Sequence, residues 1–122
     1  MKVSVCKSKI HKARITECDL NYEGSLEINI DYMDEVGMVP YERILVVNAT
    51  NGERLETYAI PGPPGKPVFR LNGAAARRGA VGDTITIMSF GILDEEESRG
   101  FVPKVIVLDE SNAIAERKGS LR

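Results

Sequence analysis

The chain has 122 residues, of which 43% are hydrophobic and 28% charged, the balance of one ordinary globular domain rather than a disordered chain. Its formal charge of −2 disfavours nucleic acid and anionic membranes as partners, because both demand a basic surface. No apolar run approaches the roughly 20 residues that cross a bilayer, no secretory signal is visible, and two cysteines are too few for a disulfide scaffold. We therefore expect a cytoplasmic protein with no nucleic-acid or membrane partner.

Short runs rich in β-branched residues recur along the chain, separated by turn signals at close intervals. They predict strands over residues 3–10 and 11–18, or one bent strand across both, and further strands over 25–30, 43–49, 53–60, 68–71, 84–90 and 102–108. Between the third and fourth strands, residues 31–36 predict a short helix with Asp31 as its N-cap and Gly37 as its end. Asn51-Gly52 predicts a type I′ turn between the next two strands, because both residues tolerate a positive φ.

The remaining segments are connections. Residues 61–65, Pro-Gly-Pro-Pro-Gly, predict a stiff loop outside any strand ladder. Asn72 is placed to cap one helical turn over residues 72–76, and residues 94–97, Asp-Glu-Glu-Glu, predict a solvated helix start.

The spacing of these elements predicts the fold class. Short strands without βαβ spacing indicate a mainly β protein, a small barrel of six to eight strands with short helical turns. We expect one domain over residues 1–110. The apolar pattern ends near Ser111, so residues 111–122 predict a flexible C-terminal tail.

The sequence lacks the residues that several common kinds of metal, nucleotide and hydrolase site require. The single histidine, His11, rules out a multi-histidine metal site within one chain, and Cys6 and Cys18 have no metal-ligand spacing, so we expect no metal. Phosphate-binding glycine loops and the GxSxG nucleophile motif are also missing.

One peptide bond attracts attention, Gly24-Ser25. Glycine leaves its carbonyl unshielded and permits strained backbone angles, and the next residue offers a hydroxyl that can attack that carbonyl. Two residues alone most often form an ordinary turn, so the interpretation depends on the rest of the chain.

Over roughly residues 1–110 the chain resembles the aspartate 1-decarboxylase family of pyruvoyl-dependent enzymes. The matching runs are Lys7-Ser-Lys-Ile-His11, Asp19-Leu-Asn-Tyr-Glu-Gly-Ser25, Asn51-Gly-Glu-Arg54, Thr57-Tyr-Ala-Ile60, Asn72-Gly-Ala-Ala-Ala76 and Gly82-Asp83. The resemblance implies a double-psi β-barrel, a homotetramer with active sites between adjacent subunits, and decarboxylation of L-aspartate to β-alanine for pantothenate synthesis.

The resemblance also implies how the cofactor arises. A zymogen cleaves itself between Gly24 and Ser25 into residues 1–24 and 25–122, and Ser25 becomes a covalent pyruvoyl group that forms a Schiff base with the substrate; neither PLP nor a metal takes part. Some relatives need a separate maturation factor, and the sequence leaves open whether this chain does.

Site residues follow from the same matches. Ser25 is the pyruvoyl precursor, Tyr58 the proton donor, and Thr57 and Asn72 assist processing. The residues expected at the substrate are Lys9, His11, Tyr22, Arg54, Thr57, Gly73, Ala74 and Ala75. Arg54 suits a bidentate clamp on a carboxylate, and Lys9 a second cation.

Two other interpretations stay open. One is a pyruvoyl decarboxylase of a related amino acid such as glutamate, because one extra methylene gives only about 1–3 kcal/mol of discrimination. The other is a small β-barrel binding module that never cleaves itself, which predicts an intact Gly24-Ser25 bond.

Overall fold

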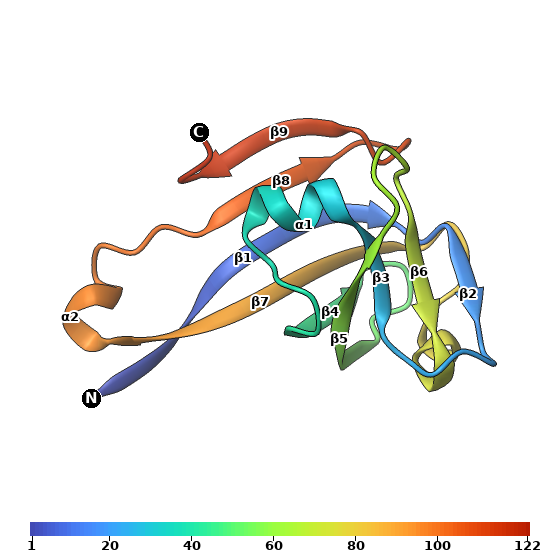
Figure 1. Cartoon of the computed structure of the whole chain (residues 1–122), viewed down its shortest axis with the longest axis horizontal. Coiled ribbons are helices and arrows are strands. Elements are labelled where there is room, and N and C mark those ends of the chain that lie inside the picture. Colours follow the sequence, from blue (N-terminus) through green and yellow to red (C-terminus); the bar gives the residue numbers. More distant parts are fainter.

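A computed structural model describes residues 1–122, and nine strands hydrogen-bonded into one sheet dominate it (Figure 1). The strands are β1 (Lys2–Arg14), β2 (Glu17–Asp19), β3 (Leu26–Asn29), β4 (Arg43–Asn48), β5 (Arg54–Gly62), β6 (Phe69–Asn72), β7 (Thr84–Asp94), β8 (Lys104–Leu108) and β9 (Ile114–Gly119). The helical segments are α1 (Ile30–Val36), the 3-10 helix η1 (Gly73–Arg78) and α2 (Glu95–Ser98).

The sheet closes into a barrel because β1 and β2 are consecutive in the chain but lie far apart in the strand order. The order is β2-β6-β3-β5-β4-β7-β1-β8-β9, and β2 follows β1 after only Ile15 and Thr16. The amide of Ile15 donates to the Asp83 carbonyl at 3.0 Å, and that of Thr16 to the Phe69 carbonyl at 2.9 Å. One bent chain thus supplies β2 at one end of the order and β1 between β7 and β8, and the bonds of Ile15 and Thr16 join these two parts of the sheet. This confirms the expected small β-barrel.

The barrel interior is filled by apolar side chains from every side of the sheet. Alternation along each strand directs these residues inward, as Leu26 and Ile28 on β3 illustrate. The core comprises Ile10, Ala13, Ile15, Leu26, Ile28, Met33, Val36, Met38, Ile44, Val46, Ala59, Phe69, Leu71, Ile85, Ile87, Ile106 and Leu108. With the interior packed, a reaction site must lie at the surface of the barrel.

Beyond the barrel, the beginning of β1 and the end of β7 continue as a two-stranded arm that α2 terminates (Figure 1). Lys2 pairs with Asp94 at the tip. Asp94 and Glu97 form a capping box that starts α2, as the acidic run predicted. Phe90 and Ile92 on the arm expose 46% and 72% of their surface, so this arm presents apolar groups to solvent.

Three local predictions need correction. Asn29, rather than Asp31, caps α1: its side chain accepts from the Asp31 amide at 2.7 Å, while Gly37 ends the helix in the left-handed conformation as expected. At the β4–β5 turn only Gly52 has a positive φ, so the turn is not type I′. The Asn48 carboxamide accepts from the amides two and three residues later and holds a wider loop.

The proline-rich segment was expected to stay outside the ladder, but its first two residues extend β5. Pro61 and Gly62 pair in parallel with Ile28 and Asn29 of β3. A proline keeps its carbonyl acceptor although it lacks an amide donor, so it can occupy a ladder position that requires only acceptance.

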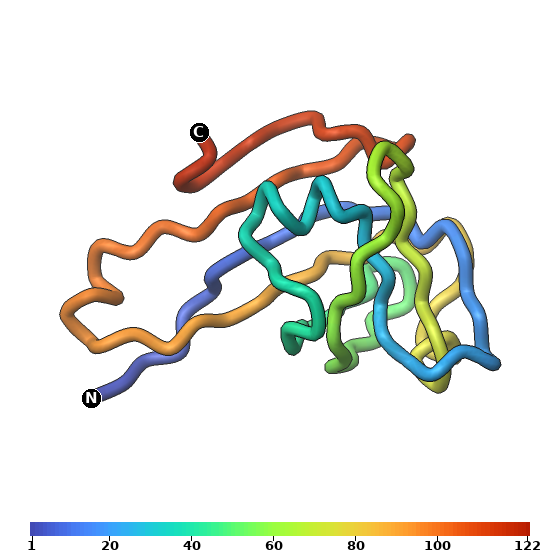
Figure 2. Tube along the Cα trace, viewed as in Figure 1, coloured from blue at the N-terminus to red at the C-terminus, as the bar shows by residue number.

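The C-terminal segment also differs from expectation. Residues 114–119 form β9, antiparallel to β8, and this strand takes the count to nine rather than six to eight. The red C-terminal segment runs back alongside the orange segment that precedes it (Figure 2). Asn112 anchors the preceding turn: it is buried, its carboxamide bonds to both backbone polar groups of Arg14, and its carbonyl accepts from Tyr32. Only Ile114 carries an inward apolar signal in this strand, which is why the sequence pattern missed it. None of the three helical segments is long and apolar enough to cross a membrane.

Candidate active site

Three segments that are distant in sequence meet at one pocket of about 370 Å³. They are the loop after β2, the middle of β5, and the β6–η1 junction. The lining residues are Leu20, Tyr22, Glu23, Gly24, Ser25, Glu56, Thr57, Tyr58, Asn72, Gly73, Ala74 and Ala75. Most of the residues that the sequence singled out therefore come together within one chain.

The backbone at Gly24-Ser25 is unusual. Gly24 has φ +97° and Ser25 has φ +90°, and Ser25 is only 1% exposed. Glycine adopts such angles freely, but a residue with a Cβ does so at a cost of about 1–3 kcal/mol. The strain lies at the one peptide bond whose cleavage the sequence suggested.

Asn72 fixes Ser25 from the neighbouring strand. Its amide donates to the Ser25 carbonyl at 3.0 Å, and its side-chain Nδ2 donates to Ser25 Oγ at 3.2 Å. The Asn72 side chain was expected to cap η1, but it makes no such bond because it faces Ser25 instead. Its Oδ1 is buried without a partner, which leaves a free acceptor beside the serine.

Gly73 explains how η1 approaches the Gly24 backbone so closely. Its φ is +65°, and a Cβ there would lie 2.6 Å from Gly24 N, 2.7 Å from Gly24 Cα and 2.8 Å from Tyr22 O. No side chain fits in this contact. Ala74 and Ala75 continue the lining with small groups, so the pocket stays open above the Gly24-Ser25 bond.

Thr57 and Tyr58 supply hydroxyl groups from β5. Both line the pocket with Ser25, and Tyr58 is about one third exposed. An adjacent hollow of about 360 Å³ is lined by Tyr22, Glu23, Ser25, Tyr41, Tyr58, Ile60 and Pro61. Tyr58 and Ser25 therefore border both hollows, which places a proton-bearing group near the strained serine.

Lys9, His11 and Arg54 do not line either hollow. Lys9 and His11 lie on β1, which is separated from β5 by β4 and β7 in the sheet order. Arg54 is exposed at the start of β5, where its carbonyl accepts from Arg78. A single chain thus leaves all three of these substrate-binding candidates outside the pocket.

His11 is held on the barrel surface by a neighbour. Its Nδ1 shares a hydrogen bond with Thr86 Oγ1 over 2.9 Å. Burial, together with the positive charges of Lys9 and Lys12, lowers the pKa of His11 below its ordinary value of 6.5.

Tyr41 and Glu56 line these hollows without having been predicted from the sequence. Glu56 lies two residues before Tyr58, and strand alternation alone could have placed both on one face of β5. Its carboxylate pairs with Arg43 of β4. Tyr41 gave no sequence signal, because it precedes β4 in an irregular turn and reaches the site only through the fold.

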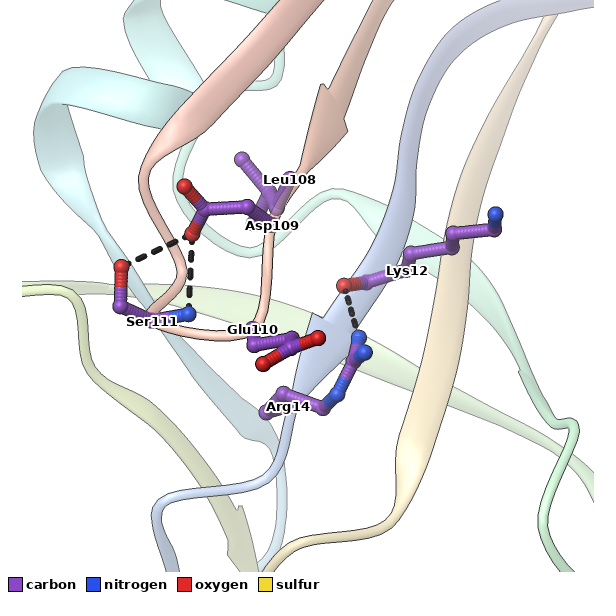
Figure 3. A pocket seen from close by; sticks show the side chains of 6 residues that line it. All are labelled: Lys12, Arg14, Leu108, Asp109, Glu110 and Ser111. Atoms are coloured by element: carbon purple, nitrogen blue, oxygen red, sulfur yellow. Dashed lines mark hydrogen bonds between the residues drawn. The ribbon is translucent and has the colours of Figure 1, made fainter.

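A larger hollow, of about 470 Å³, lies elsewhere and holds none of the predicted site residues (Figure 3). Lys12 and Arg14 of β1 line it together with Asp109 and Glu110 of the β8–β9 turn, and the Lys12 amine points away from both carboxylates (Figure 3). The Asp109 carboxylate accepts from the Ser111 amide and hydroxyl, so it stabilises its own turn.

The fold and this pocket define a small β-barrel protein whose site is built around a strained Gly-Ser peptide bond. A family model described as aspartate decarboxylase matches residues 1–115. The chain belongs to the aspartate decarboxylase family, whose fold is the double-psi β-barrel.

Individual relatives agree with the family match. A protein named aspartate 1-decarboxylase from Chlorobium phaeobacteroides is 51% identical over 92% of this chain and 86% of its own length. Its counterpart in Chlorobium luteolum is 52% identical over 92% of this chain and 88% of its own length. The protein of that name in Carboxydothermus hydrogenoformans is 45% identical over 97% and 93% of the two chains.

Proposed function

We propose that this chain is an aspartate 1-decarboxylase that releases CO₂ from L-aspartate to form β-alanine, the precursor for pantothenate synthesis, after cleaving itself between Gly24 and Ser25. Family membership and the names of its relatives support the reaction. The single observation that carries the self-cleavage is Ser25 itself, which is buried, held at φ +90° and hydrogen-bonded at Oγ by Asn72.

The cleavage begins with attack of Ser25 Oγ on the Gly24 carbonyl carbon. A C–O bond forms, the C–N bond breaks, and the amide becomes an ester with a free amine on Ser25. The strained backbone favours this step because the rearrangement releases the positive φ of an amide-bonded Ser25. Asn72 and Thr57 are the side chains available to orient the hydroxyl and to stabilise the negative oxygen that develops.

Elimination and hydrolysis complete the maturation. A base removes the Ser25 α-proton, the Cβ–O bond breaks, and Gly24 leaves as a carboxylate. Residue 25 is then dehydroalanine, which takes up one water and releases one ammonia to give the pyruvoyl group. The small residues of η1 leave space for the water that enters and the ammonia that leaves, and Asn72 Oδ1 offers them a free hydrogen-bond acceptor.

When formed, the pyruvoyl group supplies a carbonyl that condenses with the substrate amine and accepts the electron pair left by CO₂. Tyr58, at the border of both hollows, is the group of this chain placed to return a proton to the substrate α-carbon. Gly73, Ala74, Ala75 and Tyr22 shape the walls around the substrate.

Aspartate brings two carboxylates, and the cations that would bind them lie outside the pocket of their own chain. We infer that a second copy completes the site, in a homotetramer with active sites between adjacent subunits. Lys9 and His11 on the outer face of β1, and Arg54 at the exposed start of β5, would reach a neighbour's pocket, where Arg54 would hold a carboxylate in a bidentate pair. The exposed apolar residues Phe90 and Ile92 on the arm support an association of this kind.

The test is the intact mass of the purified protein under denaturing conditions, with turnover of L-aspartate and L-glutamate measured on the same sample. We expect two fragments of about one fifth and four fifths of the 13.4 kDa chain, the larger one lighter by one ammonia than a chain beginning with serine. Ser25→Ala should abolish both cleavage and turnover, whereas Ser4→Ala, in exposed β1 sequence, should change neither. Turnover by an uncut chain would contradict the proposal. A uniformly uncut, inactive chain that folds normally would indicate either a precursor that awaits a maturation factor or the binding module.

A further inference from the structure

We propose that Tyr41 is a positioning residue for Tyr58: its ring packs against the Tyr58 ring and holds that phenol toward the hollow it shares with Ser25. This inference rests on the proposed function, because it assigns a purpose to the orientation of the expected proton donor. Both tyrosines and Ser25 line the same hollow of about 360 Å³.

The backbone of Tyr41 is strained. Its φ is +70°, in the left-handed region that a bulky aromatic residue rarely adopts. Glycine or asparagine would occupy this position with less strain. Because tyrosine is costly at this backbone conformation, we infer that the ring is kept for a contact that it makes.

The turn that carries Tyr41 is bonded directly to the strand that carries Tyr58. The Tyr41 amide donates to the Ala59 carbonyl at 2.7 Å, and the Ala59 amide donates to the Glu42 carbonyl at 3.0 Å. Ala59 is the residue next to Tyr58. The two aromatic residues therefore cannot shift independently of each other along the strand.

An ion pair beneath the turn fixes it to β1. Lys7 Nζ donates to Glu42 Oε1 at 2.9 Å and to the Gly37 carbonyl at 2.9 Å. Glu42 Oε1 also accepts from the Val39 amide at 3.0 Å. The turn is thus held at Gly37, Val39 and Glu42, and the strain at Tyr41 has no simple route of relaxation.

The rings of Tyr41 and Tyr58 lie close enough to interact. The centroids of Tyr41 and Tyr58 are 6.2 Å apart with the planes tilted by 36°, within the range of interacting aromatic pairs. Tyr58 is 37% exposed, so on an open strand its side chain would sample several rotamers. A neighbouring ring reduces that freedom and favours the rotamer that faces the hollow.

The experiment compares Tyr41→Gly, which removes the ring and relieves the strain, with Tyr41→Phe, which keeps the ring. In the processed enzyme, Tyr41→Gly should lower kcat by about 10-fold with little change in KM, without loss of thermal stability and with normal cleavage by mass. Tyr41→Phe should restore kcat. In a Tyr58→Phe background, Tyr41→Gly should add no further loss of kcat, because the phenol that Tyr41 positions is already missing.

A second readout does not depend on activity. In tyrosine-labelled protein, nuclear Overhauser contacts should join the two rings, and Tyr41→Gly but not Tyr41→Phe should shift the Tyr58 resonances. Unchanged kcat in Tyr41→Gly, an equal loss in the Tyr58→Phe background, or rings without mutual contacts would each overturn the positioning role. An inactive wild-type protein with the ring contacts present would instead overturn the proposed function alone.

Discussion

Asn72 holds Ser25 at two points: its amide lies 3.0 Å from the Ser25 carbonyl oxygen, and its Nδ2 lies 3.2 Å from Ser25 Oγ. The first bond fixes the backbone and the second the hydroxyl, so one residue sets the direction in which the serine oxygen points. Gly73, the next residue, lies directly against the Gly24 backbone, so the β6–η1 junction contacts both residues of the Gly24-Ser25 bond.

Removing the Asn72 side chain should slow cleavage rather than unfold the barrel. In Asn72→Ala we expect processing about 100-fold slower than in the wild type, because orientation of the nucleophile and one polar group near the developing charge are lost. The measurement is the fraction of cut chain by mass over time. Asn21→Ala is the matched control, since Asn21 is exposed and close to the cut in sequence. A wild-type rate in Asn72→Ala would remove Asn72 from processing.

A methyl group at Gly73 should be destabilising. The new Cβ would lie within 2.8 Å of backbone atoms of Gly24 and Tyr22, and its φ of +65° adds strain. We expect Gly73→Ala to lower the free energy of unfolding by about 1–3 kcal/mol and to impair cleavage. Gly100→Ala, where a Cβ meets no atom within 4 Å, should be nearly neutral. Urea denaturation of both variants checks this, and equal stability would mean that the loop adapts freely.

The strain at Ser25 can be measured without any chemistry. Ser25→Gly and Ser25→Ala both lack the hydroxyl and should stay uncut, so their stabilities compare directly. At φ +90° the glycine variant should be the more stable by roughly 1 kcal/mol. At Ser4, within β1, the same pair should show the opposite order, since glycine weakens a strand. If alanine were the more stable at both positions, Ser25 would not be strained.

The Lys7–Glu42 pair predicts a pH dependence of stability. Burial alone would raise the pKa of Glu42, but hydrogen bonds from Lys7 and the Val39 amide outweigh it and hold the pKa below its ordinary value of 4.5. This carboxylate therefore contributes stability above about pH 4.5, and the contribution is lost as the pH falls through the lower pKa of the folded state.

Glu42→Gln should accordingly cost about 1–2 kcal/mol at pH 7 and little in strong acid. Glu95→Gln, in an exposed pair with Arg99, should cost almost nothing at either pH. Denaturation curves at pH 7 and pH 3 give the comparison. A penalty that does not change with pH would show that the charge of Glu42 is irrelevant.

Arg54 separates substrate binding from maturation. Arg54→Ala should leave cleavage intact, because Arg54 does not line the pocket of its own chain. Its kcat/KM for aspartate should fall about 10- to 100-fold through loss of a charged hydrogen-bonding partner. Arg99→Ala, at an exposed arginine directly after α2, controls for the change in net charge. Normal aspartate turnover in Arg54→Ala would exclude it from the carboxylate role.

The sequence could predict the elements and site residues that have a local signature. Leu26 and Ile28 alternate as β3 requires, Gly37 ends α1, and the matched runs identified the segments that converge on Ser25. The α1 cap lies at Asn29 rather than at Asp31 because asparagine and aspartate are both favoured N-cap residues, and only the loop geometry decides at which of the two positions the helix begins.

The remaining features are set by contacts between distant residues. β9 has few apolar residues of its own and forms because β8 offers an open edge and Asn112 fastens the turn. The approach of Tyr41 to Tyr58 depends on a turn held by Lys7, 34 positions earlier in the chain. Such tertiary contacts leave no periodic signal in a single sequence.

The position of β1 between β7 and β8 bears on how the mature molecule would survive. A cut after Gly24 would release residues 1–24 from the covalent chain, yet β1 pairs with both neighbours and contributes Ile10 and Ala13 to the core. The small fragment would thus remain as an inserted central strand without a covalent link. Unfolding would separate two molecules, and recovery would require them to meet again, so the mature form would refold at a rate that falls on dilution, whereas the uncut precursor would refold independently of concentration.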